Sequence, residues 1–202
     1  MLYKLVVMFF SVLSAILGVK FSGRDKVPRE GALVAVANHR HWSDIVLLAL
    51  AIYPRQVHFM GKSEYGKSRF LAFLMKILGA FTVERGEADI KAIKTALGYL
   101  RRGEVVGIYP EGTRNKTDEV LLPFKEGSFM LASRGKALVV PVALTDAPNY
   151  IGLRRPRPRV IVGDPIDPRN YTAENGKPDN TALAEAVRND IEKMLLSGQD
   201  FR

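Results

Sequence analysis

The fold of this chain is decided by residues 32–44, where Ala32-Leu33-Val34-Ala35-Val36-Ala37 is followed by Asn38-His39-Arg40-His41-Trp42-Ser43-Asp44. The first six residues form a continuous apolar run with the length of a strand buried on both faces. Residues 45–50 are apolar again and predict a helix. Polar residues between a buried strand and a helix lie at the edge where open α/β sheets bind ligands, so this segment predicts a functional site.

His39 and Asp44 in that segment are candidates for a catalytic base and its orienting partner. A carboxylate bonded to one ring nitrogen fixes the tautomer and favours the imidazolium that forms when the other nitrogen takes a proton. We therefore interpret His39 as a general base held by Asp44. The competing interpretation is an ordinary loop that enters a helix, because three histidines and 21 carboxylates produce this spacing by chance.

A second apolar strand, predicted near 104–109, runs into the turn Pro110-Glu111-Gly112-Thr113-Arg114. Proline and glycine favour a tight turn whose backbone N–H groups can face an anion, and Arg114 adds a planar fork suited to phosphate. A surface turn with a solvated arginine is the alternative.

A third strand, predicted near 80–84, leads to Arg85. If the three strands lie side by side in one sheet, His39, Arg85 and Arg114 converge at one edge. The alternative for Arg85 is an ion pair with Glu84 or Glu87.

Four blocks of the sequence together carry a family resemblance: NHRHWSD, GAFTVER, YPEGTR and VVPVAL, the last spanning 139–144. In this order, over about residues 31–145, they resemble the conserved blocks of the glycerolipid acyltransferases. The similarity is greatest to the 1-acyl-sn-glycerol-3-phosphate acyltransferase family, also called lysophosphatidic acid acyltransferases.

The resemblance implies that His39 and Asp44 are the catalytic pair. It also implies an acceptor-phosphate pocket shaped by Lys62, Arg85, Glu111, Gly112, Thr113 and Arg114. His41 departs from the family pattern, because many relatives place a serine at that position. The local hydrogen bonding around His41 is therefore expected to differ.

The implied reaction moves a fatty acyl group from a thioester on acyl carrier protein or coenzyme A to the free sn-2 hydroxyl of 1-acyl-glycerol-3-phosphate, which gives phosphatidic acid. It implies no metal and no cofactor. The chain has no cysteine and no G-x-S-x-G motif, which argues against an acyl-enzyme on either nucleophile. We therefore expect direct attack by the acceptor hydroxyl on the thioester. The alternative acceptor is another lysophospholipid.

Apolar strands alternate with helical patterns along the 202 residues, which predicts a single α/β domain with a mixed sheet flanked by helices. We divide the chain into a membrane-associating helix over 1–22 and an acyltransferase domain over 23–202. Strands are expected near 32–37, 56–60, 80–84, 104–109, 138–144 and 159–163. Helices are expected near 2–19, 42–52, 67–78, 87–102, 125–134 and 180–196, with a connecting loop over 164–179.

The amino terminus carries no charge between Lys4 and Lys20. At ~1.5 Å per residue this stretch covers roughly 22 Å, short of the ~30 Å hydrocarbon core. On a helix, one stripe holds Lys4, Ser11, Ser14, Ala15 and Gly18, and the opposite, bulky face holds Leu5, Met8, Phe9, Val12 and Ile16. This layout favours a helix lying in the membrane interface over a signal peptide or a buried core helix.

The net charge of +9 indicates an anionic partner. An arginine cluster at Arg154, Arg155, Arg157 and Arg159 suits anionic headgroups, which predicts association with the cytoplasmic face of the cell membrane. No base-reading motif accompanies the basic charge, so nucleic acid is not expected.

Two readings from other classes remain open. One is a metal-dependent phosphoester hydrolase with His39, His41, His58 and Asp44 as ligands. The other is a lipid-binding module without catalysis, which predicts vesicle binding but no thioester consumption.

Overall fold

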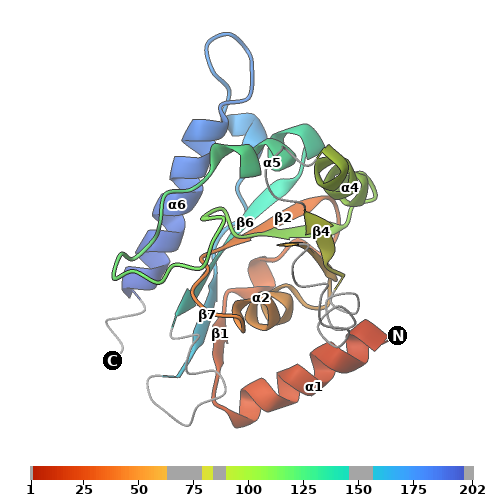
Figure 1. Cartoon of the computed structure of the whole chain (residues 1–202), viewed down its shortest axis with the longest axis vertical. Helices are drawn as coiled ribbons and strands as arrows, with labels where there is room; N and C mark the ends of the chain where they lie inside the picture. The colour runs from red at the N-terminus through yellow and green to blue at the C-terminus, as the bar shows by residue number, and fades with distance from the viewer. Residues whose placement is uncertain (1, 63–78, 84–89, 146–156, 198–202) are drawn as a thin grey trace.

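In the part of the chain that the structure describes, seven strands form one sheet in the order β1-β7-β6-β2-β5-β3-β4 (Figure 1). The computed structural model describes residues 2–62, 79–83, 90–145 and 157–197. The strands are β1 (Lys20–Ser22), β2 (Leu33–Ala37), β3 (Val57–Lys62), β4 (Phe81–Val83), β5 (Val105–Ile108), β6 (Leu138–Thr145) and β7 (Arg159–Val162).

The sheet is mixed, as predicted. Strands β2, β3, β4, β5 and β6 run parallel to their neighbours among themselves, β7 is antiparallel to β6, and β1 is parallel to β7. β2 lies directly beside β5, with Val36 opposite Ile108. The segments that follow these two strands therefore leave the sheet at the same edge, next to each other.

Helices cover both faces of the sheet (Figure 1). One face carries α1 (Leu2–Ile16) and α2 (Asp44–Ile52), and the other carries α4 (Ile90–Arg101), α5 (Met130–Gly135) and α6 (Asn180–Ser197). The side chains of β2 alternate between the two cores: Leu33 and Ala35 belong to the core that contains α2, whereas Val34 and Val36 belong to the core that contains α4, α5 and α6. All five residues of β2 are buried, because helices lie above and below it.

Most elements agree with the sequence-based expectations to within a few residues. The helix expected near 125–134 is divided into the short 3-10 helix η3 (Glu126–Ser128) and α5. The loop expected over 164–179 contains a 3-10 helix, η5 (Pro168–Asn170), and another, η1 (Arg24–Lys26), follows β1. The helix expected near 67–78 lies outside the described residues.

The edge strand β1 was not predicted. It has three residues, two of them exposed, so it lacks the apolar run that marks the inner strands. Only the pairing of Phe21 with Val160 of β7 reveals it. The last residues of the segment assigned to the N-terminal helix thus belong to the sheet.

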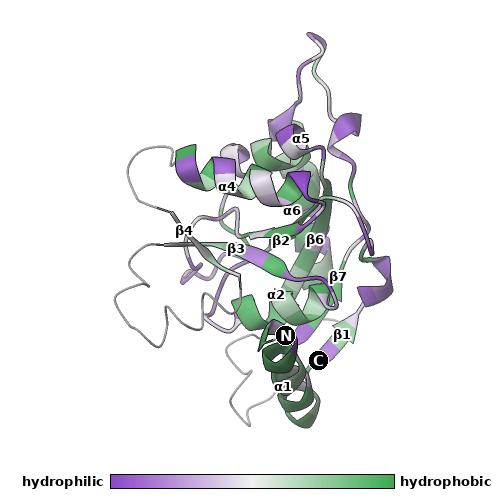
Figure 2. Cartoon of the chain, turned by 90° about the vertical axis from the view of Figure 1, so that its right-hand side faces the viewer, coloured by the Kyte–Doolittle hydropathy of each residue, from purple (hydrophilic) through white to green (hydrophobic). Residues whose placement is uncertain are grey.

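Helix α1 packs against α2 through one side and exposes an apolar face on the other. Tyr3 and Val7 join the core. Six large apolar side chains on its other faces are roughly half or more exposed: Leu2, Leu5, Met8, Phe9, Val12 and Ile16. Figure 2 shows the strongly hydrophobic ribbon of α1 at the periphery of the molecule. Within the described part of the chain, no helix is both long and apolar enough to cross a bilayer.

Candidate active site

His39 and Asp44 form the predicted pair. His39 lies two residues beyond the end of β2, and Asp44 is the first residue of α2. The Nδ1 atom of His39 is 2.8 Å from Oδ2 of Asp44. A carboxylate accepts, so Nδ1 carries the proton and Nε2 keeps its lone pair, which is the form a base requires.

The backbone of the same turn fixes the carboxylate of Asp44. The main-chain N–H groups of Arg40 and His41 both donate to Oδ2, at 2.7 and 2.8 Å. The Asp44 side chain is about 1% exposed, against 16% for that of His39. The carboxylate is thus held rigidly inside the protein, while the imidazole reaches the surface.

Glu111 supports the main chain of His39 from the neighbouring strand end. Its Oε1 accepts from the main-chain N–H of His39 at 2.7 Å, and its Oε2 accepts from that of Leu122 at 3.0 Å. Burial raises the pKa of Glu111, and these two N–H bonds oppose the rise. Both oxygens of Glu111 accept from backbone N–H groups. These contacts indicate that Glu111 positions the segments of His39 and Leu122 beside the predicted pocket.

Tyr109, which the sequence did not single out, stacks on His39. The ring centroids are 4.3 Å apart with an interplanar angle of 21°. Burial, with a smaller contribution from the charge of Asp44, raises the pKa of Tyr109 well above its usual value. The phenol is therefore neutral and serves as a flat wall for the imidazole.

The turn that carries Arg114 is hydrogen-bonded directly to the main chain of His39. The N–H of Asn115 donates to the main-chain oxygen of His39 at 2.6 Å. Arg114 also lies near His41, because its charge contributes to lowering the pKa of that histidine. The predicted convergence of Arg114 with His39 is thus present in the structure.

Two other basic side chains adjoin this turn. Arg40 donates through Nη2 to the main-chain oxygens of Thr117 and Glu119, at 2.9 and 2.7 Å, and so braces the loop. Gly112 has a φ of +70°, and a Cβ built there would lie 2.6 Å from Nζ of Lys125. The ammonium of Lys125 therefore covers the glycine, where a larger residue would be both strained and crowded.

The remaining predicted residues are placed unevenly. Gly112, Thr113 and Arg114 are exposed at the turn after β5. The backbone of Lys62 ends β3, which lies between β5 and β4, so it reaches the same edge of the sheet. Arg85 lies outside the described residues, two positions beyond the end of β4.

Asn38 stabilises the sheet, a role that the sequence analysis did not predict for it. It is 1% exposed, donates through Nδ2 to the main-chain oxygen of Leu144 at 3.0 Å, and accepts from the N–H of Leu144 at 2.8 Å. Its side chain thus extends the pairing of β2 with β6 directly before His39.

We expect Asn38→Leu to lower the free energy of unfolding by about 2–4 kcal/mol, since it leaves a buried N–H and a buried carbonyl without partners. Urea denaturation followed by circular dichroism measures this loss. A decrease below about 0.5 kcal/mol would show that water or a rearranged backbone satisfies Leu144.

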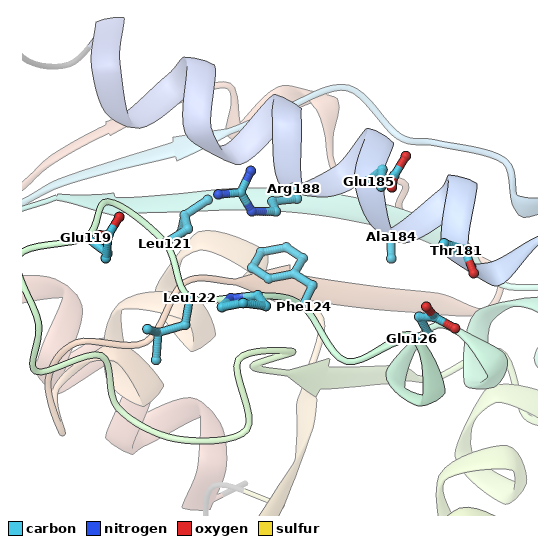
Figure 3. Close-up of a pocket in the computed structure, with 10 residues that line it drawn as sticks. Glu119, Leu121, Leu122, Phe124, Glu126, Thr181, Ala184, Glu185 and Arg188 are labelled. Atoms are coloured by element: carbon cyan, nitrogen blue, oxygen red, sulfur yellow. The ribbon is translucent and has the colours of Figure 1, made fainter.

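A pocket of about 440 Å³ lies beside the loop that Glu111 anchors (Figure 3). Leu121, Leu122 and Phe124 form one wall, and Ala184 and Arg188 of α6 lie on the other. His39 and Asp44 are not among its lining residues. Glu111 joins the two regions, because it accepts from the N–H of Leu122 at the pocket and from the N–H of His39 at the dyad.

The four ligands of the metal-site alternative do not assemble. His58 lies in β3 with its Nε2 2.8 Å from Oε2 of Glu104, the residue before β5. That is the opposite edge of the parallel strands from His39 and His41. Within the described residues, no three histidine or acidic side chains form a group that could hold a metal ion.

A surface imidazole oriented by a buried aspartate at the end of a parallel strand suits an acyltransferase that activates a substrate hydroxyl. Residues 18–145 match the family model described as Acyltransferase, and the chain belongs to that family.

Named relatives agree with this assignment. The chain is 30% identical to the 1-acyl-sn-glycerol-3-phosphate acyltransferase of Bacillus subtilis, over 88% of each protein. It is 28% identical to the enzyme of the same name from Streptococcus pneumoniae, over 86% of this chain and 65% of that one. The crystal structure of the lysophosphatidic acid acyltransferase PlsC from Thermotoga maritima shares the fold, with a TM-score of 0.78 and 22% identity over 98% of this chain and 79% of the other.

Proposed function

We propose that this acyltransferase moves a fatty acyl group from an acyl carrier protein or coenzyme A thioester to the sn-2 hydroxyl of 1-acyl-glycerol-3-phosphate. The names of the relatives support this acceptor. The observation that carries the proposal is the bond from the N–H of Asn115 to the oxygen of His39, because it holds Arg114 next to the base.

In the proposed reaction, Nε2 of His39 takes the proton of the acceptor hydroxyl as its oxygen attacks the thioester carbonyl. The imidazolium that forms is stabilised by Asp44 through Nδ1–H. When the tetrahedral intermediate collapses, the carbon–sulfur bond breaks and the imidazolium returns the proton to the leaving thiolate. His39 and Asp44 are thereby restored, and no covalent acyl-enzyme forms.

The acceptor's phosphate is proposed as the remote anchor that fixes the hydroxyl against His39. Such an anchor turns an encounter of free molecules into a step within one complex. Arg114 is exposed and adjacent to the dyad, and the predicted pocket adds Lys62, Arg85 and the turn at Gly112 and Thr113.

Arg114→Ala is expected to raise the acceptor KM by about tenfold to a hundredfold, with the donor KM little changed, because a charged hydrogen bond to phosphate is worth about 1.5–3 kcal/mol. Steady-state kinetics with each substrate varied in turn measures both constants. An equal rise in both would point to a structural role for Arg114.

The exposed apolar face of α1 is proposed to insert into the membrane interface, on the cytoplasmic leaflet. Phe9, Val12 and Ile16 are 57–75% exposed on this face. The basic charge of the chain suits anionic lipid, and of the predicted arginine cluster the structure describes Arg157 and Arg159. Such docking lets acyl chains reach His39 without crossing water.

Phe9→Glu with Val12→Glu should weaken binding to anionic vesicles at least about tenfold, since each bulky side chain kept out of lipid forfeits about 1.5–3 kcal/mol. Ser11→Glu with Ala15→Glu is the matched control, with the same added charge on the polar stripe of α1. Sedimentation with vesicles separates the two. Equal losses in both pairs would contradict insertion through the apolar face. Substitution is preferable to deletion, because Tyr3 and Val7 belong to the core.

The function is tested by thioester consumption with purified protein and a panel of acceptors. The panel contains 1-acyl-glycerol-3-phosphate, lysophospholipids with substituted phosphates, and monoacylglycerol. We expect preference for the phosphate monoester with either donor carrier. Preference for a lysophospholipid with a substituted phosphate would show that the acceptor is different and the acyl-transfer reaction is the same. Vesicle binding without thioester consumption would refute the proposal.

A further inference from the structure

The ring of His41 is held in one tautomer by Ser43. Its Nδ1 is 2.8 Å from Oγ of Ser43 and 3.4 Å from the main-chain nitrogen of Ser43, whose N–H donates to it. A backbone N–H can only donate, so Nδ1 acts as the acceptor. In neutral His41 the single ring proton is therefore on Nε2.

The position of His41 is also fixed relative to the base. Its main-chain N–H donates to Oδ2 of Asp44, the oxygen that binds Nδ1 of His39. The imidazole of His39 and the main chain of His41 are thus bonded to the same buried carboxylate. Ser43, which is fully buried, holds the ring of His41 from the start of α2.

The lowered pKa of His41 favours its neutral form. Burial is the largest cause that lowers its pKa, the charges of Arg114 and His39 lower it further, and Asp44 opposes them. The guanidinium of Arg114 is thus close enough to the imidazole for its charge to act on it. The ring is half-buried, and its Nε2 has no hydrogen-bond partner within the described residues.

The pairing of a neutral donor with an exposed guanidinium suits one kind of ligand. The Nη2 atom of Arg40 donates to two loop carbonyls, whereas Nε2 of His41 and the exposed guanidinium of Arg114 are placed to face a substrate. A phosphate monoester has several acceptor oxygens, and it can take a charged bond and a neutral one together.

We propose that His41 is a recognition residue for the acceptor's phosphate, to which its Nε2–H donates while Arg114 supplies the charge. This assignment rests on the proposed function and extends it to a residue outside the predicted pocket. It makes His41 a binding group, whereas His39 moves the proton.

The test compares three variants by kinetics and by calorimetric binding of sn-glycerol 3-phosphate. His41→Phe keeps a ring but loses the donor, His41→Gln places an amide N–H near the original Nε2, and His58→Gln changes a histidine at the far edge of the sheet. Thermal unfolding verifies each fold, and His41→Ala replaces His41→Phe if the larger ring destabilises the protein.

We expect His41→Phe to raise the acceptor KM roughly tenfold, with kcat and the donor KM changed less than about threefold, and His41→Gln to recover most of the loss. Monoacylglycerol turnover and the His58→Gln variant should be unaffected. An unchanged acceptor KM, or a fall in kcat alone, overturns the assignment. If the wild-type protein binds sn-glycerol 3-phosphate through His41 but transfers no acyl group, the proposed function fails and the phosphate assignment stands.

Discussion

His39→Ala is expected to reduce kcat by about 10³-fold or more, because general-base catalysis contributes about 10²–10⁴ and this variant also removes the group that returns the proton. Acceptor binding should survive, since we propose that other residues hold the phosphate. Single-turnover thioester assays measure the chemical step, and calorimetry with sn-glycerol 3-phosphate measures binding.

The fold of the His39→Ala variant needs a separate control. The backbone of His39 makes the bonds to Glu111 and Asn115, and alanine keeps that backbone. The melting temperature should therefore fall little. Residual activity above about a tenth of wild type in a folded variant would end the assignment of His39 as base, whatever the family resemblance.

The sequence sufficed for the parts of the site that depend on local order. The apolar run at 32–37 predicts β2, and the first histidine after it is His39. The same pattern therefore locates both the end of the strand and the proposed base. Asp44 is five residues further along the chain, and its contact with His39 needs only the start of α2. Arg114 follows because β5 is parallel to β2 and ends beside it.

Contacts between distant segments could not be predicted in this way. The position of Glu111 in the Pro110–Arg114 turn predicts a residue of the phosphate pocket. In the structure, both of its carboxylate oxygens accept from backbone N–H groups, one of them 72 positions away in sequence. The stacking of Tyr109 on His39 likewise depends on the register of two strands. A single sequence has no local pattern that distinguishes a side chain supporting the site from one facing the substrate.

The edge strand β1 shows the same limit for the fold. Inner strands are buried on both faces and appear as apolar runs, but Lys20–Ser22 is a half-exposed edge. The apolar periodicity of α1 was visible, and its bulky face is exposed as that pattern indicated, whereas the burial of Tyr3 and Val7 is set by α2.

Asp44→Asn is expected to lower kcat by about 10²–10⁴-fold while the protein stays folded, because the imidazolium loses its counter-charge. Oδ2 of Asp44 accepts from two backbone N–H groups and from His39, whereas Oδ1 is buried without a partner in the described structure. An asparagine can place its oxygen at the Oδ2 position and keep all three bonds. Asp44→Ala removes the acceptor, leaving two N–H groups unpaired, and should also destabilise the protein by about 1–3 kcal/mol for each one left buried.

A double-mutant cycle decides whether Asp44 acts through His39 alone. If the carboxylate only orients and charges the imidazole, Asp44→Asn should have almost no further effect in the His39→Ala background, because residues that work as a unit are not additive. Rates of thioester consumption for the four proteins provide the coupling. A full additional loss in the double variant would mean that Asp44 contacts the substrate or the reacting atoms directly. Its burial argues against such a contact, because its side chain is about 1% exposed and is bonded to the ring of His39.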